Sequence, residues 1–369
     1  MGVAERRRRS ADPVGRTVEE LETPALVLDR AVAEANAAAM GERIARLPAA
    51  LRPHVKVHKC AELARLQLAH GAIGVTTATV AEAAAMLEAG VPDVLIANEV
   101  VGDAAIRHLV ATAGAGDVTV AVDDAGNLER IAAAARAAGV TIGVVVEVDV
   151  GMGRGGARDV VGACRLGRAA AELEGVRLRG LLGYEGHCAS EPDRATRERA
   201  TREAMDRLLE AAGRFRDEGL PVDVVSAGAT GTFDIAGAIE GITEVQAGSY
   251  LLMDRFHAPL VEGFGFALTI ATTAISVHDD LVVFDAGRKA VGADFGPPDA
   301  PGADGDFAFI HEEHLGIRYP SGAPFRVGDR AALVPAYAPI AVNLFGAFHV
   351  VQDGTVVDRW AVRARHGDP

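Results

Sequence analysis

The sequence predicts an α/β protein in which a (β/α)8 barrel of the TIM type is followed by an antiparallel β domain. From Thr23 to about Gln246, short runs of β-branched residues alternate with Ala-rich helical stretches. That alternation is typical of parallel βα units. After about Phe264 the helical patterns stop and segments of alternating polarity follow. A chain of 369 residues is long enough to fold into two such domains.

The first region contains nine candidate strands, one more than an eight-stranded barrel needs. The last eight follow one another at roughly regular spacing, so we expect the barrel to begin at Arg52 and the first strand, Ala25–Leu28, to pair elsewhere. The barrel candidates are Arg52–Val57, Ile73–Thr77, Asp93–Ala97, Val118–Val122, Ile142–Val148, Val176–Tyr184, Asp223–Ser226 and Glu244–Ala247, with helical patterns between them such as Val80–Ala89, Gly126–Ala138 and Asp193–Glu218.

The second region contains alternating segments that predict antiparallel strands. The clearest is a hairpin over His349–Trp360, because Asp353-Gly354 between two alternating runs is a strong hairpin signal. The other segments are Ala267–Val277, Leu281–Phe284 and Arg330–Val334. We therefore expect a disordered tail at residues 1–20, a strand within 21–30 that joins the C-terminal sheet, a barrel at 31–263 and a β domain at 264–369.

Composition excludes several classes of function. The formal net charge of −14 argues against a nucleic-acid partner, and no apolar run is long enough to span a membrane. The three cysteines are widely spaced and form no CxxC pair, so we expect neither a disulfide framework nor a structural zinc site, and the reducing cytoplasm fits. Arg6–Arg9 precede no apolar segment, which predicts a tail and not a signal peptide.

Lys56 lies where the first barrel strand is expected to end, and barrel enzymes place their sites at the C-terminal ends of the strands. A buried lysine with Arg52, His54, His58 and Lys59 nearby should have a lowered pKa. More of it would then be the neutral amine that forms Schiff bases. The alternative is a basic loop exposed to solvent.

Two Gly-rich turns follow the seventh and eighth barrel strands, at Ser226–Thr232 and Ala247–Tyr250. Small residues let backbone N–H groups approach an anion closely. One such turn is usually only a tight turn, but two at these strand ends suggest a phosphate site.

Further polar side chains are expected at the same rim. Arg154, flanked by glycines after the fifth strand, could reach a phenolate oxygen or a carboxylate, or could form a surface ion pair. Tyr184, Glu185 and His187 follow the sixth strand, and His187 could be functional or merely structural. A Schiff-base lysine, a phosphate cradle and an arginine on one rim are what pyridoxal phosphate (PLP) requires.

These motifs resemble the fold-type III PLP enzymes, with their alanine racemase-like barrel, and most closely the D-threonine aldolase and D-serine dehydratase branch. The likeness runs from about residue 20 to the end. It is carried by Glu22–Asp29, Arg52–Lys59, Ile96–Val100, Glu147–Gly156, Tyr184–His187, Ser226–Thr232, Gly248–Asp254, Asp285–Ala290, Glu312–His314 and the C-terminal hairpin.

The resemblance implies that Lys56 bonds to the cofactor's aldehyde and that Arg154 contacts its ring oxygen. It also implies a head-to-tail homodimer. We count Tyr184 among the cofactor-binding residues. The phosphate would be held by Gly228, Thr230, Gly231, Gly248, Ser249 and Tyr250.

One segment departs from the branch. Before Val342-Asn343-Leu344 the branch carries a His-x-Cys or His-x-Asp pair, which binds a divalent metal that holds the substrate's β-hydroxyl. Here Tyr337 stands in the histidine's place and Pro339 in that of the second ligand. A neutral phenol is a poor ligand for a divalent ion and proline has no donor, so we expect no metal site.

Three functions are compatible with these residues. The first is a lyase, an aldolase or dehydratase, acting on a β-hydroxy D-amino acid, with His187 or Tyr337 replacing the metal at the β-hydroxyl. The second is a racemase or epimerase with Lys56 and Tyr337 on opposite faces of Cα. The third is a PLP-binding protein without turnover, against which the long C-terminal domain argues.

Overall fold

The computed structural model describes residues 12–302 and 304–366. Residue contacts divide the chain into two units. The barrel unit comprises Ala37–Tyr250 and Pro259–Glu262, and the sheet unit comprises residues 12–36, Leu251–Ala258 and Gly263–Arg365. None of the helices in the described part of the chain is long and apolar enough to cross a membrane.

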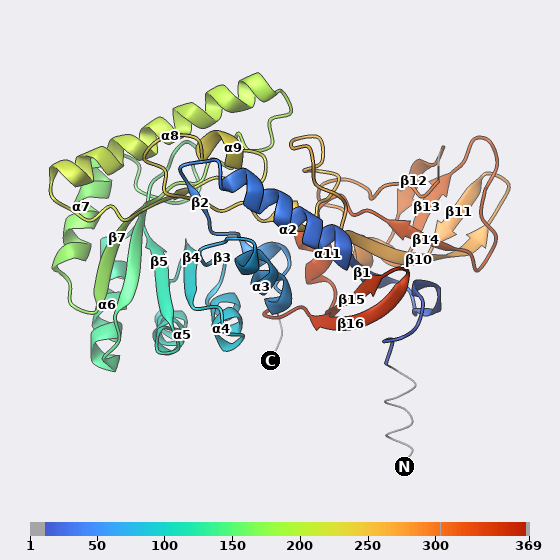
Figure 1. The fold of residues 1–369 in the computed structure, drawn as a ribbon, viewed down its shortest axis with the longest axis horizontal. Coiled ribbons are helices and arrows are strands. Elements are labelled where there is room, and N and C mark those ends of the chain that lie inside the picture. Colours follow the sequence, from blue (N-terminus) through green and yellow to red (C-terminus); the bar gives the residue numbers. More distant parts are fainter. Residues whose placement is uncertain (1–11, 303, 367–369) are drawn as a thin grey trace, which may run out of the picture. The chain divides into compact units, whose positions relative to one another are not determined.

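The barrel unit is built on eight parallel strands in the order β2-β9-β8-β7-β6-β5-β4-β3 (Figure 1). The backbone N–H groups of Ile73 and Thr76 donate to the carbonyls of Leu51 and Pro53, at 2.9 Å each, and so join β3 to the segment around β2. The predicted α/β barrel is therefore confirmed. Its strands are β2 (Ala50–Leu51), β3 (Val75–Thr77), β4 (Asp93–Glu99), β5 (Asp117–Val122), β6 (Ile142–Glu147), β7 (Val176–Leu182), β8 (Val224–Ala227) and β9 (Glu244–Val245).

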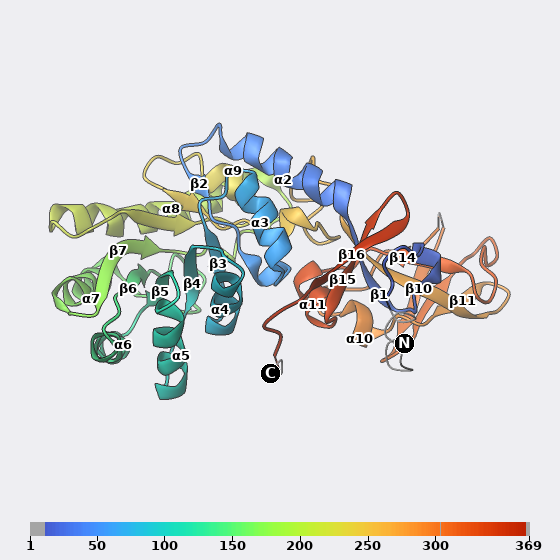
Figure 2. The same cartoon turned by 60° about the horizontal axis from the view of Figure 1, so that its bottom comes forward.

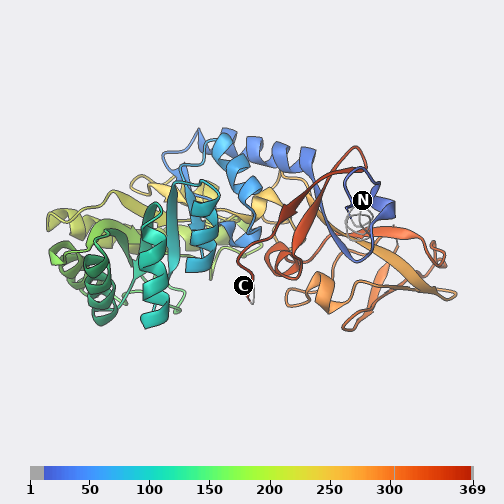
Figure 3. The ribbon, with the colours of Figure 1, turned by 90° about the horizontal axis from the view of Figure 1, so that it is seen from below.

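Helices follow the strands and lie on the outside of the parallel sheet (Figures 1 and 3). Several begin at a side chain that caps the first turn. Thr79, Asp124 and Asp193 each accept a hydrogen bond from the backbone N–H three residues later, which satisfies a donor that the helix leaves unpaired. The helices are α2 (Arg30–Ile44), α3 (Ala61–Ala69), α4 (Val80–Glu88), α5 (Asp103–Ala113), α6 (Ala125–Ala138), α7 (Val160–Glu172), α8 (Arg194–Asp217) and α9 (Phe233–Ala236).

The first predicted barrel strand was placed too far along the chain. The sequence predicts a strand over Arg52–Val57, but β2 ends at Leu51 and Val55–Val57 form a 3₁₀ turn, η2. Pro53 has no N–H to donate to a neighbouring strand. Beyond it, the only strand-like pairings among the described residues are an isolated bridge between His54 and Thr76 and a 3.2 Å hydrogen bond from the His54 N–H to the Gln246 carbonyl. Lys56 therefore lies in the turn after the strand.

The sheet unit is an antiparallel sheet with one parallel pair, in the order β12-β13-β11-β10-β1-β15-β16, with β14 also paired to β10. Its strands are labelled in Figure 1, and Figure 2 shows the sheet from another side. Strand β1 (Ala25–Asp29) lies between β10 and β15, antiparallel to the first and parallel to the second. The other elements are β10 (Leu268–Val277), β11 (Leu281–Phe284), α10 (Arg288–Val291), β12 (Asp306–Ile310), β13 (Leu315–Arg318), β14 (Arg330–Leu333), α11 (Ala338–Asn343), β15 (Ala347–Gln352) and β16 (Thr355–Ala361).

Local sequence signals explain parts of this sheet. Asp353 and Gly354 both have positive φ, as the tight turn between β15 and β16 requires. Asp285, after β11, accepts hydrogen bonds from the hydroxyls of Thr23 and Thr272 at 2.6 and 2.7 Å and so ties three segments together.

The expected N-terminal tail falls largely on residues 1–11, which lie outside the described residues. From residue 12 the chain lies along the β15–β16 hairpin. The Gly15 N–H donates to the Val356 carbonyl at 2.8 Å, and Val18–Glu20 form a 3₁₀ turn, η1.

Candidate functional site

Lys56 projects from η2 toward Tyr184 and Arg154, which come from the loops after β7 and β6. Its Nζ lies 5.9 Å from the centroid of the Tyr184 ring, and the Arg154 guanidinium carbon lies 5.4 Å from the same centroid. Burial lowers the pKa of Lys56, and the positive charge of Arg154 lowers it further, while Glu82 opposes both. The structure thus brings three of the predicted site residues together and favours the neutral amine of Lys56.

The cause that the sequence predicts for the lowered pKa of Lys56 is partly wrong. Arg52 points into an ion-pair network, with Nε 2.9 Å from Glu244 Oε2 and Nη1 2.8 Å from Asp93 Oδ1. Its charge is compensated there and does not act on Lys56.

Lys59 and His58 do not supply the charge that lowers the pKa of Lys56 either. Lys59 is buried and pairs with Glu82 at 3.2 Å. Burial lowers the pKa of His58 to about 4, so it is neutral at physiological pH. The repelling charge on Lys56 comes from Arg154, a residue distant in sequence.

His54 is buried between η2 and the barrel strands, with its Nδ1 unpaired among the described residues. Burial, followed by the charge of Lys56, holds its pKa well below the usual range. A neutral imidazole therefore lies beside the lysine.

Tyr250 is tied to η2 by a chain of buried polar groups. The Cys60 N–H donates to His58 Nδ1, His58 Nε2 donates to Gln67 Oε1 at 3.1 Å, and Gln67 Nε2 donates to the Tyr250 hydroxyl at 3.0 Å. The side chain of Tyr250, predicted to hold phosphate, is fully buried, and its hydroxyl accepts this hydrogen bond.

The turn after β8 is fixed from inside by Glu185, a fully buried residue of the Tyr184–His187 motif. Its carboxylate accepts hydrogen bonds from the Gly228 N–H, at 3.1 Å, and from the Thr232 hydroxyl. The N–H of Gly228 is thus already used, although the sequence suggested it for phosphate.

The other N–H groups of the two turns remain available. Those of Thr230, Gly231, Gly248 and Ser249 face no protein acceptor among the described residues. The turns are linked by a hydrogen bond of 3.3 Å from the Tyr250 N–H to the Thr230 hydroxyl. An array of free N–H groups at the ends of β8 and β9 fits a phosphate.

Two glycines in these turns are required by close packing. A Cβ on Gly231 would clash with the Ala189 carbonyl oxygen, and one on Gly248 would clash with the His54 carbonyl oxygen. A side chain at either position would displace the turn itself.

His187 is placed differently from the other rim residues. Its side chain is exposed, and its ring lies beside Gly151, where an added Cβ would be 3.1 Å from Nε2. This position gives His187 less support as an acid or base than the sequence pattern suggested.

Tyr337 belongs to the sheet unit, at the residue before α11. Its ring stacks on Phe295, with centroids 4.2 Å apart, and on His257, with centroids 5.7 Å apart. Burial raises the pKa of Tyr337, and the charge of Asp254 raises it further, so the phenol is protonated at neutral pH.

Sequence reasoning missed Asp254 and His257 as partners of this tyrosine. Asp254 is fully buried, and its carboxylate accepts hydrogen bonds from His257 Nδ1 at 2.7 Å and from the Ala338 N–H at 2.8 Å. The available signal was an acid and a histidine three residues apart, the acid being the last residue of the Gly248–Asp254 motif.

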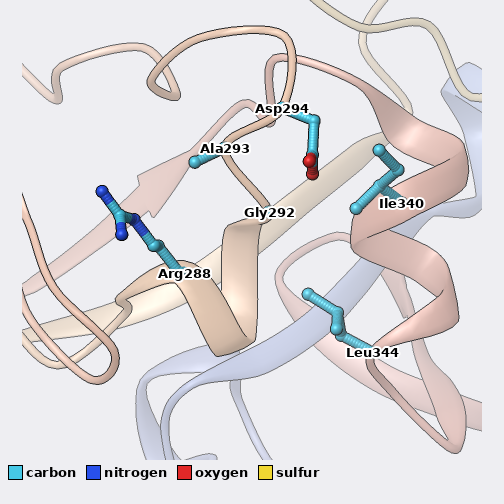
Figure 4. Close-up of a pocket in the computed structure, with 6 residues that line it drawn as sticks. All are labelled: Arg288, Gly292, Ala293, Asp294, Ile340 and Leu344. Carbon is cyan, nitrogen blue, oxygen red and sulfur yellow. The ribbon is translucent and has the colours of Figure 1, made fainter.

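A cavity of about 380 Å³ in the sheet unit borders the segment that carries Tyr337 and Pro339. Ile340, on α11, and Leu344, the residue directly after α11, line this cavity together with Asp294 (Figure 4). Within residues 12–302 and 304–366, no group of three or more His, Cys, Asp or Glu side chains is arranged to hold a metal ion.

Comparison with protein families gives two matches. Residues 28–255 match the model for the alanine racemase N-terminal domain, and residues 267–351 match a putative serine dehydratase domain. Together they span both structural units.

Individual relatives agree with these matches. The chain is 38% identical to D-threonine aldolase of an Arthrobacter species, over 96% of this chain and 94% of that one. It is 33% identical to 3-hydroxy-D-aspartate aldolase of Paracoccus denitrificans, over 95% and 94%.

Solved structures show the same fold. The D-threonine aldolase of Filomicrobium marinum superposes with a TM-score of 0.92 at 32% identity, covering 96% of this chain and 98% of that one. The D-threo-3-hydroxyaspartate dehydratase of Delftia superposes with a TM-score of 0.85 at 27% identity, covering 94% and 98%. The chain therefore belongs to the fold-type III family of PLP-dependent enzymes, in the branch that contains the D-threonine aldolases and hydroxyaspartate dehydratases.

Proposed function

We propose that this protein is a PLP-dependent lyase that cleaves a β-hydroxy D-amino acid. Relatives that match along nearly the whole chain are named as aldolases of D-threonine and of 3-hydroxy-D-aspartate, and another is named as a dehydratase of D-threo-3-hydroxyaspartate. We further propose that it works in the cytoplasm, which the three widely spaced cysteines fit, and as a homodimer, which the resemblance implies.

The observation that carries this proposal is the buried Lys56, whose pKa is lowered, on the same barrel as two turns with free N–H groups. Lys56 would hold the cofactor's aldehyde, Arg154 and Tyr184 would face its ring, and the N–H groups of Gly231 and Gly248 would receive its phosphate. PLP, when bound, supplies an electron sink for negative charge at the substrate's Cα.

The protein's own residues must still move a proton at the β-hydroxyl. We assign this role to Tyr337 in preference to His187, because Tyr337 is held by stacked rings and by the segment fixed to Asp254, whereas His187 is exposed. A protonated phenol can donate to the β-oxygen in dehydration, and its anion can accept the β-hydroxyl proton when the Cα–Cβ bond breaks. Neither role needs a metal at positions 337 and 339.

Covalent trapping tests the cofactor assignment. The chain has only three lysines, Lys56, Lys59 and Lys289. Borohydride reduction of protein loaded with PLP, followed by peptide mass spectrometry, should place the label on Lys56 alone. Lys56→Ala should abolish it and exposed Lys289→Ala should not. A label on Lys59, or one that survives Lys56→Ala, would contradict the assignment.

Product analysis tests the reaction. With D-threonine or 3-hydroxy-D-aspartate, an aldolase releases glycine and an aldehyde, and a dehydratase releases ammonia and a keto acid. Inversion at Cα with neither product would show that the protein is a racemase, for which Lys56 and Tyr337 are the candidate acid/base pair.

A further inference from the structure

Arg154 rests against a pair of carboxyl groups at the barrel rim. Its Nη2 lies 3.4 Å from Oε1 of Glu147, the last residue of β6. Glu99, the last residue of β4, lies next to Glu147 and beside Gly155. A Cβ built on that glycine would be 3.4 Å from Glu99 Oε1 and 3.6 Å from Glu147 Oε1. Two acids and one cation therefore share this part of the rim.

The two carboxyl groups cannot both be satisfied as anions. Glu147 is 3% exposed, and both Glu147 Oε2 and Glu99 Oε1 are buried without a hydrogen-bond partner among the described residues. Carboxylate oxygens only accept, so two of them side by side need a donor. Arg154, whose side chain is 52% exposed, cannot compensate both the buried Glu147 and the half-buried Glu99 as anions.

We propose that one proton bridges Glu99 and Glu147, and that this acid pair is a positioning device that holds the Arg154 guanidinium over Tyr184, ready for the cofactor's ring oxygen. This inference rests on the proposed function, because it assigns Arg154 the cofactor as its partner. Glu147 acts through Arg154 and is a positioning residue.

The charges around Glu147 support a bound proton at neutral pH. Burial raises the pKa of Glu147 to about 8, the hydrogen bond and charge of Glu99 act in the same direction, and Arg154 opposes them. Asp123, directly after β5, accepts a hydrogen bond from the Gly156 N–H at 3.0 Å. Lys56 on η2, and His54 just before η2, lie close enough to Arg154 for their charges to interact.

The protonation state of Glu147 decides how strongly Glu147 binds Arg154. Below about pH 8 Glu147 is a neutral acid that positions the guanidinium by its contact without a full ion pair, so Arg154 keeps its charge for an anionic oxygen. Above that pH it is a carboxylate, and a full ion pair would draw Arg154 away from the ring. We expect cofactor binding through Arg154 to weaken in alkali.

The first test measures the proton directly in cofactor-free protein. In protein labelled with ¹³C-glutamate, one carboxyl resonance should titrate near pH 8. It should disappear in Glu147→Gln and persist in Glu172→Gln, an exposed control on α7. In Glu99→Gln it should move to lower pH, because the amide supplies the missing donor. A Glu147 resonance that titrates near pH 4.5 would overturn the proposal.

The second test measures the consequence for Arg154 with pyridoxine 5′-phosphate. This analogue has no aldehyde, so Lys56 chemistry does not contribute to binding. The glutamine of Glu147→Gln imitates the neutral acid at every pH. Wild type and Glu147→Gln should bind the analogue equally at pH 6.5, and wild type should bind about threefold or more weakly than the variant at pH 9.5.

A constant ratio of the two affinities from pH 6.5 to 9.5 would refute the positioning role, even if Glu147 titrates near pH 8. Failure of the proposed function has a different signature. The analogue would then not bind wild type at any pH and borohydride would label no lysine, which would also overturn the role of Arg154 toward the cofactor.

Discussion

Replacing Glu244 by glutamine should destabilise the barrel unit by about 3 kcal/mol. Arg52, just after β2, and Glu244, at the start of β9, form an ion pair in which both side chains are nearly fully buried, 4% and 3% exposed. Removing one partner of a buried pair costs about 3–5 kcal/mol because the other charge is left uncompensated. Asp93, 26% exposed, still bonds Arg52, so we expect the lower end of that range.

Urea denaturation can measure this loss in each unit. With an m value of about 3 kcal/mol/M, a loss of 3 kcal/mol lowers the midpoint by about 1 M. Circular dichroism follows the helices, most of which belong to the barrel unit, whereas Trp360, the one tryptophan of the chain, lies on β16 in the sheet unit. We expect the circular dichroism midpoint to fall. If the fluorescence midpoint of Trp360 falls by the same amount, the two units unfold together.

The matched control is Glu174→Gln. Glu174 pairs with Arg136 at 3.9 Å, and the two side chains are 81% and 65% exposed. Such a surface pair contributes less than about 0.5 kcal/mol. If Glu244→Gln and Glu174→Gln shift the midpoint equally, the buried ion pair does not hold the start of the barrel together.

Two further predictions concern Tyr337 and His58. Activity should survive prolonged chelation and should not rise with added Mn²⁺ or Zn²⁺, whereas Tyr337→Phe should lower kcat by about 10²-fold or more through loss of a proton-transfer group. Activity lost on chelation and restored by a divalent ion would contradict this. Because His58 has a pKa of about 4 in the folded protein and about 6.5 when unfolded, the unfolded state binds more protons between these values. Stability should fall by up to roughly 3 kcal/mol as the pH drops from 6.5 to 4. His58→Gln should flatten that dependence in urea midpoints, and an unchanged slope would show that His58 is not responsible.

Most of the architecture could be predicted because its signals are local. Strand β11 has the predicted bounds, and the Asp353-Gly354 turn is where the sequence places it. Strands β12 and β13 were missed, since their short segments carry no strong alternation. The error at Arg52–Val57 arose because Val55 and Val57 favour a strand by their local preference, whereas the folded chain forms a 3₁₀ turn there, just after Pro53.

The sequence by itself determined which types of residue lie at the site: a lysine after the first barrel strand, an arginine among glycines, and two turns with small residues. It also pointed to a tyrosine and a proline where metal ligands are expected. These are properties of single segments, which composition and spacing reveal.

Only the tertiary structure decided which groups act on one another. Arg154, distant from Lys56 in sequence, lies near it in the fold. Arg52 and Lys59, which are close to Lys56 in sequence, instead form ion pairs with Glu244 and Glu82. Glu185 uses the Gly228 N–H, and the carboxyl groups of Glu99 and Glu147 meet at the rim. Burial and charge–charge interactions depend on distances between segments that are far apart in the sequence, and those distances exist only once the chain has folded.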